Sequence, residues 1–291
     1  MITLLIPITH IGWLVHYKFR VDYQGSQYWS AEQSLTADLV NPVMVSVGGG
    51  SFSLTILKSA AEPLEGARCY VFNDHGTYLD LMGAANSEGQ VFFDLADGAY
   101  RMRVDHLGYQ FWSPIYEVPE TLLASLDLAQ KDVVVAVEGL YQSAEPLAGL
   151  KVYLFTPENY YLSQNQTTDT DGLATFSLPD RPYRVRVDYL GHQFWSDDFQ
   201  AQNTTVTIHR GMAAVHAGRS GADVPGAAVY LFSENESYLG WKETTDASGR
   251  SGFVLPDRAF KFRVDDNGEQ YWSDVVQIQA GEVNAVDVNL D

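Results

Sequence analysis

Apolar and polar residues alternate with a period of two along most of the chain, and turn-forming residues interrupt the alternation every 8 to 12 residues. In residues 183–188, for example, a tyrosine and two valines alternate with two arginines and an aspartate. Successive side chains of a strand point to opposite faces of a sheet, so the first set predicts a core face and the second an outer face. No segment shows the apolar period of about 3.6 that is typical of a surface helix. The pattern therefore predicts an all-β protein.

A phrase within this pattern returns four times. Arg-Val-Asp is followed each time by a short turn and then by glutamine, an aromatic residue, tryptophan and serine. The four tryptophans, Trp29, Trp112, Trp195 and Trp272, lie 83, 83 and 77 residues apart. Self-similarity at such a period indicates a tandem array of domain-sized units.

The repeats also predict domain boundaries. About 50 residues of recognisable repeat precede each of the last three phrases, whereas the first phrase begins at Tyr17. We therefore expect full repeats at residues 49–130, 131–210 and 211–291, and an incomplete half repeat at residues 1–48. The connections between the full repeats, around Lys131 and at Arg210 to Gly211, are short, which predicts little hinge freedom.

Two explanations of the half repeat stay open. Either the natural gene begins upstream of Met1 with further repeats, or a strand from another molecule fills the gap. A half sandwich leaves backbone groups unpaired at a sheet edge, and such an edge invites an added strand. The apolar segment 2–15 could be the donor or could help to complete the sheet. It contains Pro7 and His10, lacks a basic start and is too short to cross a bilayer, so we expect a strand there.

Each full repeat contains the same motifs in the same order. In the second one they are Pro-Leu-x-Gly at 146–149, Val-Tyr-Leu-Phe at 152–155, Thr-Asp-x-x-Gly at 168–172, Leu-Pro-Asp at 178–180 and Tyr-x-x-Arg-Val at 183–187. This order resembles the prealbumin-like modules called carboxypeptidase regulatory-like domains, which are close in plan to the B-type repeats of bacterial collagen adhesins. The resemblance implies a tandem array of Ig-like (prealbumin-like) β-sandwiches of about seven strands. It also implies spacer, stalk or accessory folding roles in secreted and surface proteins.

The turn of the last phrase predicts the register of a hairpin. Asn267–Gly268 is a strong signal for a two-residue hairpin loop. Such a loop pairs Val264 with Tyr271 on the core face. On the outer face it pairs Arg263 with Trp272. We expect the same register in all four phrases.

The outer face of each hairpin would then bring arginine against tryptophan. A guanidinium above an indole is worth roughly 0.5 to 2 kcal/mol. Asp265 would lie opposite Gln270 and end the row with a hydrogen bond. The candidate assembly or ligand face consists of Arg20, Trp29, Arg103, Trp112, Arg186, Trp195, Arg263 and Trp272.

Charge affects how this face is interpreted. The chain has 37 acidic and 18 basic residues and a net charge of -19, so nucleic acid and anionic membranes would repel it, and we expect neither as a partner. Yet 8 of the 18 basic residues lie at outer positions of the four hairpins. Two explanations stay open. The row braces a solvent-facing or interdomain surface, or it docks either the acidic face of another copy or a carbohydrate that stacks on tryptophan.

The sequence lacks the motifs typical of enzymes and metal sites. Its seven histidines have no metal-ligand spacing, and it has no Gly-x-Ser-x-Gly, Walker or His-Glu-x-x-His motif. Residues 169–172 resemble the start of a calcium loop, but the later ligands are missing, so we interpret them as a turn. No histidine recurs with the serine that follows each tryptophan, so a nucleophilic role is not expected. We predict no catalytic residue, no metal and no cofactor.

Two further features concern covalent chemistry. Cys69 is the only cysteine, so an intrachain disulfide is excluded, and we expect its thiol to be buried in a strand. Three Asn-x-Ser/Thr sequences make Asn165, Asn203 and Asn235 candidate glycosylation acceptors.

These observations together predict a non-enzymatic structural protein on or outside a cell. We expect a repeat-domain subunit of a fibre or filament, which assembles with its own copies head to tail by β-strand addition and through the Arg/Trp faces. The alternative is the stalk of an adhesin whose tryptophans contact a glycan or another cell-surface ligand.

Overall fold

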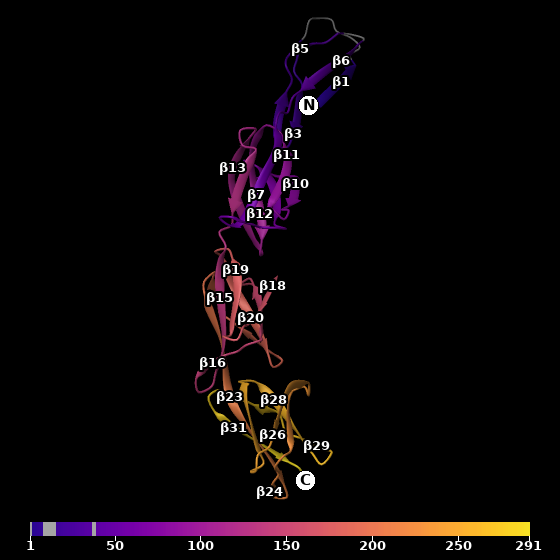
Figure 1. Ribbon diagram of the computed structural model, residues 1–291. Coiled ribbons are helices and arrows are strands. Elements are labelled where there is room, and N and C mark those ends of the chain that lie inside the picture. The colour runs from indigo at the N-terminus through magenta and orange to yellow at the C-terminus, as the bar shows by residue number, and fades with distance from the viewer. Residues whose placement is uncertain (1, 8–15, 37–38) are drawn as a thin grey trace. The chain divides into compact units, whose positions relative to one another are not determined.

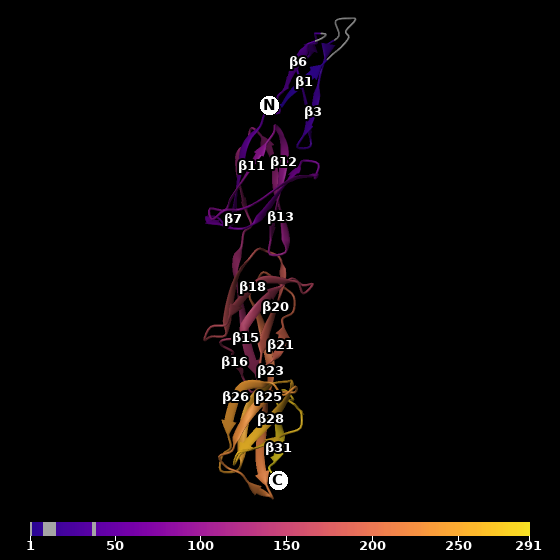
Figure 2. The same ribbon diagram turned by 90° about the vertical axis from the view of Figure 1, so that its right-hand side faces the viewer.

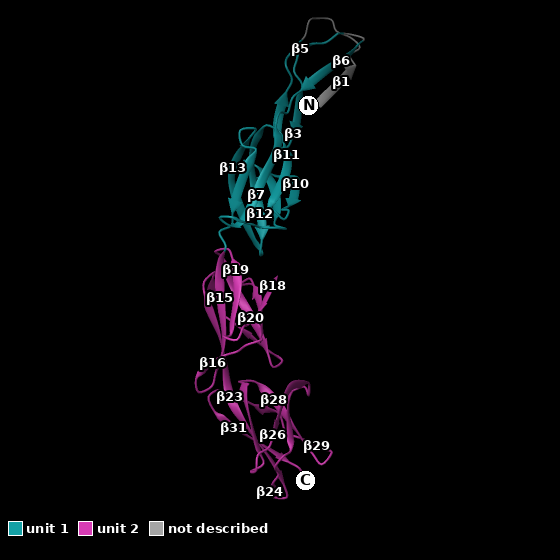
Figure 3. Cartoon of the chain, in the orientation of Figure 1, with its two compact units in different colours: residues 1–130 teal, residues 131–291 magenta. Residues whose placement is uncertain are grey.

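The computed structural model describes residues 2–7, 16–36 and 39–291 (Figure 1). Every regular element in these ranges is a β-strand, which confirms the prediction of an all-β protein. The same ranges contain no helix of the length and apolar character needed to span a membrane. The chain divides into two compact units, residues 1–130 and 131–291 (Figure 3).

The larger part of the first unit is a sandwich of two four-stranded sheets. One sheet contains β7 (Gly50–Ser59), β8 (Glu62–Pro63), β11 (Gln90–Leu95) and β14 (Leu123–Asp127), and the other contains β9 (Arg68–Asn73), β10 (Tyr78–Ala84), β12 (Gly98–His106) and β13 (Tyr109–Val118). The sheet orders are β11-β7-β14 and β10-β9-β12-β13. The first and last strands, β7 and β14, are parallel neighbours, so the chain enters the sandwich at one end and leaves it at the other.

Alternate residues of β7 and β12 fill the space between these sheets. Phe52, Leu54 and Ile56 come from β7, and Met102 and Val104 from β12, and all five are fully buried. Burial of each such side chain stabilises the fold by about 1.5–3 kcal/mol. The core face predicted from the period of two is therefore present.

The second unit contains two sandwiches of the same plan. The strands of the first are β15 (Lys131–Leu140), β16 (Ala144–Pro146), β17 (Lys151–Phe155), β18 (Tyr161–Thr167), β19 (Leu173–Leu178), β20 (Pro182–Tyr189), β21 (His192–Trp195) and β22 (Phe199–Gln200). Those of the second are β24 (Ala222–Asp223), β25 (Ala228–Ser233), β26 (Tyr238–Thr244), β27 (Arg250–Pro256), β28 (Ala259–Asp266), β29 (Glu269–Trp272), β30 (Val276–Gln277) and β31 (Val283–Asn289). The two sandwiches share β23 (Thr204–Arg219).

Strand β23 replaces the short connection expected between these sandwiches. Its residues 204–209 run parallel to β15, and its residues 212–218 run parallel to β31 (Figure 1, Figure 2). Because first and last strands are parallel in both sandwiches, the last strand of one can continue as the first strand of the next. The backbone hydrogen bonds of the two sheets therefore join the sandwiches without a loop.

Arg210 closes the corner at this junction. It is only 6% exposed, and its guanidinium donates to the carbonyl oxygen of Gly139 (3.0 Å) and pairs with Glu145 (2.9 Å). A Cβ atom on Gly139 would lie 2.2 Å from Nε of Arg210, so glycine leaves the room that the guanidinium occupies.

A hairpin tip makes the second contact of the junction. Leu190, between β20 and β21, has φ 46° and packs against the core of the next sandwich. The ring of His192 contacts Phe260 edge to face, with centroids 5.2 Å apart, and Arg258 lies 4.8 Å from the ring centre of Phe194. A leucine at positive φ is strained, and its burial in the neighbour offsets that cost.

The N-terminal part of the first unit contains six short strands. They are β1 (Ile2–Pro7), β2 (His16–Tyr17), β3 (Arg20–Tyr23), β4 (Ser26–Trp29), β5 (Gln33–Ser34) and β6 (Val40–Val45). The strand expected in segment 2–15 is present as β1, which pairs antiparallel with β6, while residues 8–15, with His10, lie outside the described ranges. The tip of the β3–β4 hairpin binds the following sandwich, because the Gln24 amide donates to Asp94 O and accepts from Ala96 N.

Gln130 occupies the position in the first sandwich that Arg210 occupies in the second, and it makes a different polar contact. The Gln130 amide donates to Nε2 of His106 at 2.8 Å. To accept this bond, Nε2 must carry no proton, so the imidazole is neutral. Burial lowers the pKa of His106 to about 4. The unfolded chain, with an ordinary histidine pKa near 6.5, therefore binds more protons than the folded chain between those values.

Acid should destabilise the first sandwich through this histidine. Its contribution is fully present above about pH 6.5 and is lost as the pH falls towards 4, by about 1–3 kcal/mol in total. We expect His106→Gln to reduce the difference between the urea midpoints at pH 7 and pH 4.5. An unchanged difference would show that His106 does not carry the acid sensitivity.

Gly139→Ala should displace the buried guanidinium at the β23 junction. We expect a loss of about 2–3 kcal/mol, because the charge-assisted hydrogen bonds of Arg210 are strained or broken. The measurement is urea unfolding, compared with Arg210→Ala and the double variant. If the cost of Gly139→Ala persists in the Arg210→Ala background, the clash is not its cause.

Candidate functional site

The four signature hairpins have the register that the sequence predicted. Asn267 and Gly268 form the two-residue turn with φ of 50° and 86°, and Val264 lies opposite Tyr271. The arginine–tryptophan pairs lie directly opposite in every hairpin, as Arg20 with Trp29, Arg103 with Trp112, Arg186 with Trp195, and Arg263 with Trp272. The structure thus brings together each pair of the candidate face, one pair per repeat.

The nearest ring to each of these arginines in the complete sandwiches is a tyrosine that sequence reasoning missed. The guanidinium carbon of Arg103 lies 4.5 Å from the centre of Tyr70. The matching distances are 4.7 Å from Arg186 to Tyr153 and 4.8 Å from Arg263 to Tyr230, against 5.9 and 5.8 Å to the tryptophans. The predicted contact of arginine with tryptophan is present, but the tyrosine lies closer because the strand on the other side of β12, β20 or β28 places it directly opposite the arginine.

A second cation lies over each of these tryptophans. Arg101 is 5.2 Å from the ring centre of Trp112, Arg184 is 5.3 Å from Trp195, and Lys261 is 5.4 Å from Trp272. A phenylalanine of the neighbouring strand, Phe72, Phe155 or Phe232, contacts the same tryptophan at 4.7–4.9 Å. The outer face of each complete sandwich is therefore a row of interleaved rings and cations across four strands. Its tryptophans remain 36–39% exposed.

Carboxylates neutralise most of this positive charge. Arg263 donates from Nε and from an NH2 group to the two oxygens of Asp265, at 2.7 and 3.0 Å. The same i, i+2 pair recurs as Arg20–Asp22, Arg103–Asp105 and Arg186–Asp188. Asp265 lies opposite Gln270 as predicted, but its carboxylate binds the stronger donor, the guanidinium.

The recurring serine has a structural task that sequence reasoning did not find. Ser196 is 5% exposed, and its hydroxyl accepts a hydrogen bond from the backbone N–H of Val185 (3.0 Å). Equivalent bonds join Phe19 to Ser30, Met102 to Ser113, and Phe262 to Ser273, at 2.9–3.0 Å. The ladder between β12 and β13 shifts register between Arg101 and Arg103, so the serine satisfies an N–H that the β-bulge leaves unpaired. The fixed Trp-Ser spacing is the signal that could have revealed this bulge.

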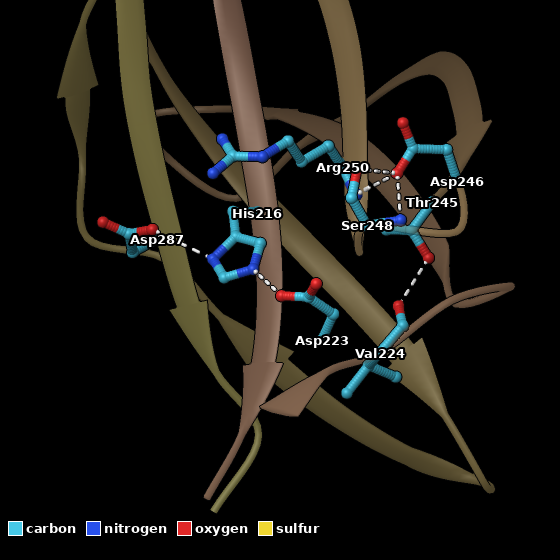
Figure 4. A network of polar contacts seen from close by, with 8 residues as sticks. All are labelled: His216, Asp223, Val224, Thr245, Asp246, Ser248, Arg250 and Asp287. Atoms are coloured by element: carbon cyan, nitrogen blue, oxygen red, sulfur yellow. Dashed lines mark hydrogen bonds and ion pairs between the residues drawn. The ribbon is translucent and has the colours of Figure 1, made fainter. Parts of the chain in front are cut away.

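The calcium-like turns are held by their own side chains. The Oδ1 atom of Asp246 accepts hydrogen bonds from the backbone N–H groups of Ser248 and Arg250 and from the Ser248 hydroxyl (Figure 4). These bonds hold the pKa of that carboxyl below its usual range. Asp169 makes the same two backbone bonds, so turn geometry accounts for the motif. Nearby, His216 lies between Asp223 (2.9 Å) and Asp287 (3.3 Å).

The remaining candidates lie apart from the Arg/Trp rows, except for one sequon. Burial raises the pKa of the Cys69 thiol to about 12, which makes the thiol unreactive. The sequon asparagines are exposed: Asn203 accepts from the N–H of Val134 at 2.9 Å, and Asn235 lies in the turn before β26. Asn165 lies on β18 directly opposite Tyr153, at the margin of the aromatic row. In the described ranges, acidic, histidine and cysteine side chains form no group of three placed to hold a metal ion.

Among the comparisons with known proteins, only the one with solved structures gave matches. No family model matches the chain, and no curated protein matches it. The TIE protein of Bacillus anthracis has 14% identity over 94% of this chain and 58% of its own length, with a TM-score of 0.29. A minor pilin of Streptococcus agalactiae has 14% identity over 54% of this chain and 94% of its own length, with a TM-score of 0.34. The major pilin subunit of Bacillus cereus has 10% identity over 83% of this chain and 99% of its own length, with a TM-score of 0.26. The chain spans less than two thirds of the TIE protein, and the function proposed below rests on this chain's own residues.

Ser196→Ala should destabilise its sandwich by about 1–3 kcal/mol, because the buried N–H of Val185 loses its acceptor. The exposed Ser177→Ala in the same sandwich is the control and should change stability by less than about 0.5 kcal/mol. Urea unfolding of the full chain measures both. Equal effects of the two substitutions would mean that the bulge does not depend on the serine hydroxyl.

Proposed function

We propose that this protein is a non-enzymatic structural subunit of an extracellular or cell-surface fibre, assembling with its own copies. Copies join head to tail by β-strand addition at the N-terminal hairpin, with further contacts through the Arg/Trp faces. No cofactor is required.

The open edge of β3 is the observation that carries this proposal. In the complete sandwiches, β12, β20 and β28 each have a strand on both sides, whereas β3 pairs with β4 alone among the described residues. Val21 is correspondingly half-buried, while its counterparts Val104, Val187 and Val264 are fully buried. The hairpin therefore has the register of a complete repeat, but no strand of the described ranges pairs with the free edge of β3.

The outer face of this hairpin is also more exposed than its counterparts in the complete sandwiches. The Arg20 side chain is 45% exposed, against 20–21% for Arg103, Arg186 and Arg263. Trp29 is 55% exposed. An added strand with the pattern of β17 would place a tyrosine beside Arg20 and a small apolar residue beside Val21, and its backbone would pair with the β3 edge.

The complete sandwiches protect the corresponding edges. Edge strands β10, β18 and β26 each contain a residue at positive φ, Asp80 (58°), Ser163 (57°) or Gly240 (78°), at which the ladder shifts register. Such bulges bend an edge strand and oppose further pairing. Strand addition is thereby directed to the N-terminal hairpin.

The aromatic rows favour protein contacts over sugar stacking. A sugar would need the tryptophan face that Arg101, Arg184 or Lys261 already covers at 5.2–5.4 Å. Exposed tryptophan, tyrosine and arginine at close range are typical of the centres of protein interfaces. An adhesin that binds a glycan through these rings is therefore the weaker alternative.

Electron microscopy of the concentrated full chain should show fibres that grow with protein concentration. A synthetic peptide of residues 149–157, which contains β17, should occupy the β3 edge, shorten the fibres and reduce the exposure of Trp29. The same peptide with Asp at positions 152 and 154 is the control and should have no effect, because its core face is charged. Dispersed single chains at every concentration would contradict the proposal.

A further inference from the structure

We propose that the outer face of residues 49–130 is a docking surface for an acidic surface of a second copy of this chain. We call this surface the outer patch, and it consists of Tyr78, Met82, Arg101, Trp112 and Ile115. The inference rests on the proposed self-assembly and identifies a contact that is separate from the β3 edge.

The outer patch is the most apolar of the three aromatic rows. Met82 and Ile115 are 56% and 51% exposed, and Tyr78 and Trp112 are also exposed. Ile115 lies opposite Arg101 in the β12–β13 ladder, and Met82 lies opposite Tyr70 on β9. The two apolar side chains therefore flank the row of rings and cations on both sides.

The matching positions in the other two sandwiches are polar or mixed. Where the outer patch has Met82, the cross-strand partner of the row tyrosine is Asn165 in one sandwich and Lys242 in the other. Three residues after the tryptophan, the place of Ile115 is taken by Asp198 and by Val275. Apolar residues at both margins thus occur together only in residues 49–130 among the three complete sandwiches.

The outer patch also leaves its cation without a carboxylate. In the matching positions, Arg184 pairs with Asp198 at 3.3 Å, and Lys261 pairs with Glu236 at 2.6 Å. Arg101 donates instead to the carbonyl oxygen of Ser113 (2.9 Å), and it forms no ion pair with a described carboxylate.

Two substitutions along the chain explain this difference. Ile115 stands where Asp198 neutralises Arg184. The turn before β10 has Gly76 at the position of Glu236, which neutralises Lys261, and of Asn159, which accepts from Arg184. Both partners that the other sandwiches supply to this cation within the chain are therefore missing here.

Charge decides which occupant fits. The outer patch presents one guanidinium without a carboxylate partner, amid exposed rings, methionine and isoleucine. A complementary surface must therefore place a carboxylate against Arg101 and apolar side chains around it. A chain with 37 acidic residues and a net charge of -19 offers such carboxylates on its own surface. A carboxylate of a second copy then takes the place that Asp198 or Glu236 fills in the other sandwiches.

Sedimentation velocity of the full chain over a range of concentrations tests this contact. Ile115→Asp and Gly76→Glu each supply Arg101 with a carboxylate in its own chain, and each should weaken self-association at least tenfold. Gly76→Glu fits the turn, because Glu236 and Asn159 have φ of 60° and 66° there and a Cβ at Gly76 meets no atom within 4 Å. Val275→Asp, at the matching place in the last sandwich, is the control and should leave association unchanged.

The outcomes separate this contact from the assembly as a whole. If wild-type chains associate and both carboxylate variants associate equally well, the outer patch is not the contact, and the proposed assembly through β3 stands. If Val275→Asp weakens association as much as Ile115→Asp, the effect is added negative charge and the inference fails. Wild-type chains that stay monomeric at all concentrations would overturn the proposed assembly together with this contact. Unfolding midpoints near that of the wild type show that the variants are folded.

Discussion

The parallel pairing of first and last strands is the constraint on which the rest of the structure depends. It places the entry and exit of each complete sandwich at opposite ends. In the second unit this lets β23 serve two sheets, and the hairpin tip at Leu190 then reaches the core of the next sandwich. The Gln24 tip binds the sandwich that follows it in the first unit through backbone groups instead. This topology thus creates the β23 junction, and the two hairpin tips contact the sandwiches that follow them through different groups.

The outer faces show how a repeated motif can be specialised by a few positions. The arginine clamped between a tyrosine and an aspartate recurs in each complete sandwich, and it stabilises the face without leaving free charge. The second cation is different, because its partner comes from a connecting segment, either the turn with Glu236 or the residues after β21 with Asp198. Gly76 and Ile115 remove that partner from one sandwich alone, which changes a self-neutralised surface into one that can bind a carboxylate from outside.

Polar groups give the end corners of the sandwiches individual chemistry on a common backbone. Polar side chains fill equivalent positions at the ends of successive sandwiches. In the first they are Gln130 and His106, and in the second Arg210 contacts Gly139 and Glu145. The first pair is neutral and sensitive to acid, whereas the second holds a guanidinium that stays charged. Equivalent corners of related repeats are therefore filled by different polar groups, each held by at least one hydrogen bond to a neighbouring segment.

The sequence alone determined the strands, the core face and the hairpin register, because these depend on a period of two and on local turn chemistry, as at Asn267–Gly268. It could not predict that Tyr70 clamps Arg103, since about thirty residues separate strands that become neighbours only when the sheet forms. It also placed a connection at Arg210–Gly211 where tertiary structure formed a continuous strand. Register within a hairpin is a local property, whereas pairing between distant strands and the sharing of β23 are decided by burial of the whole sandwich.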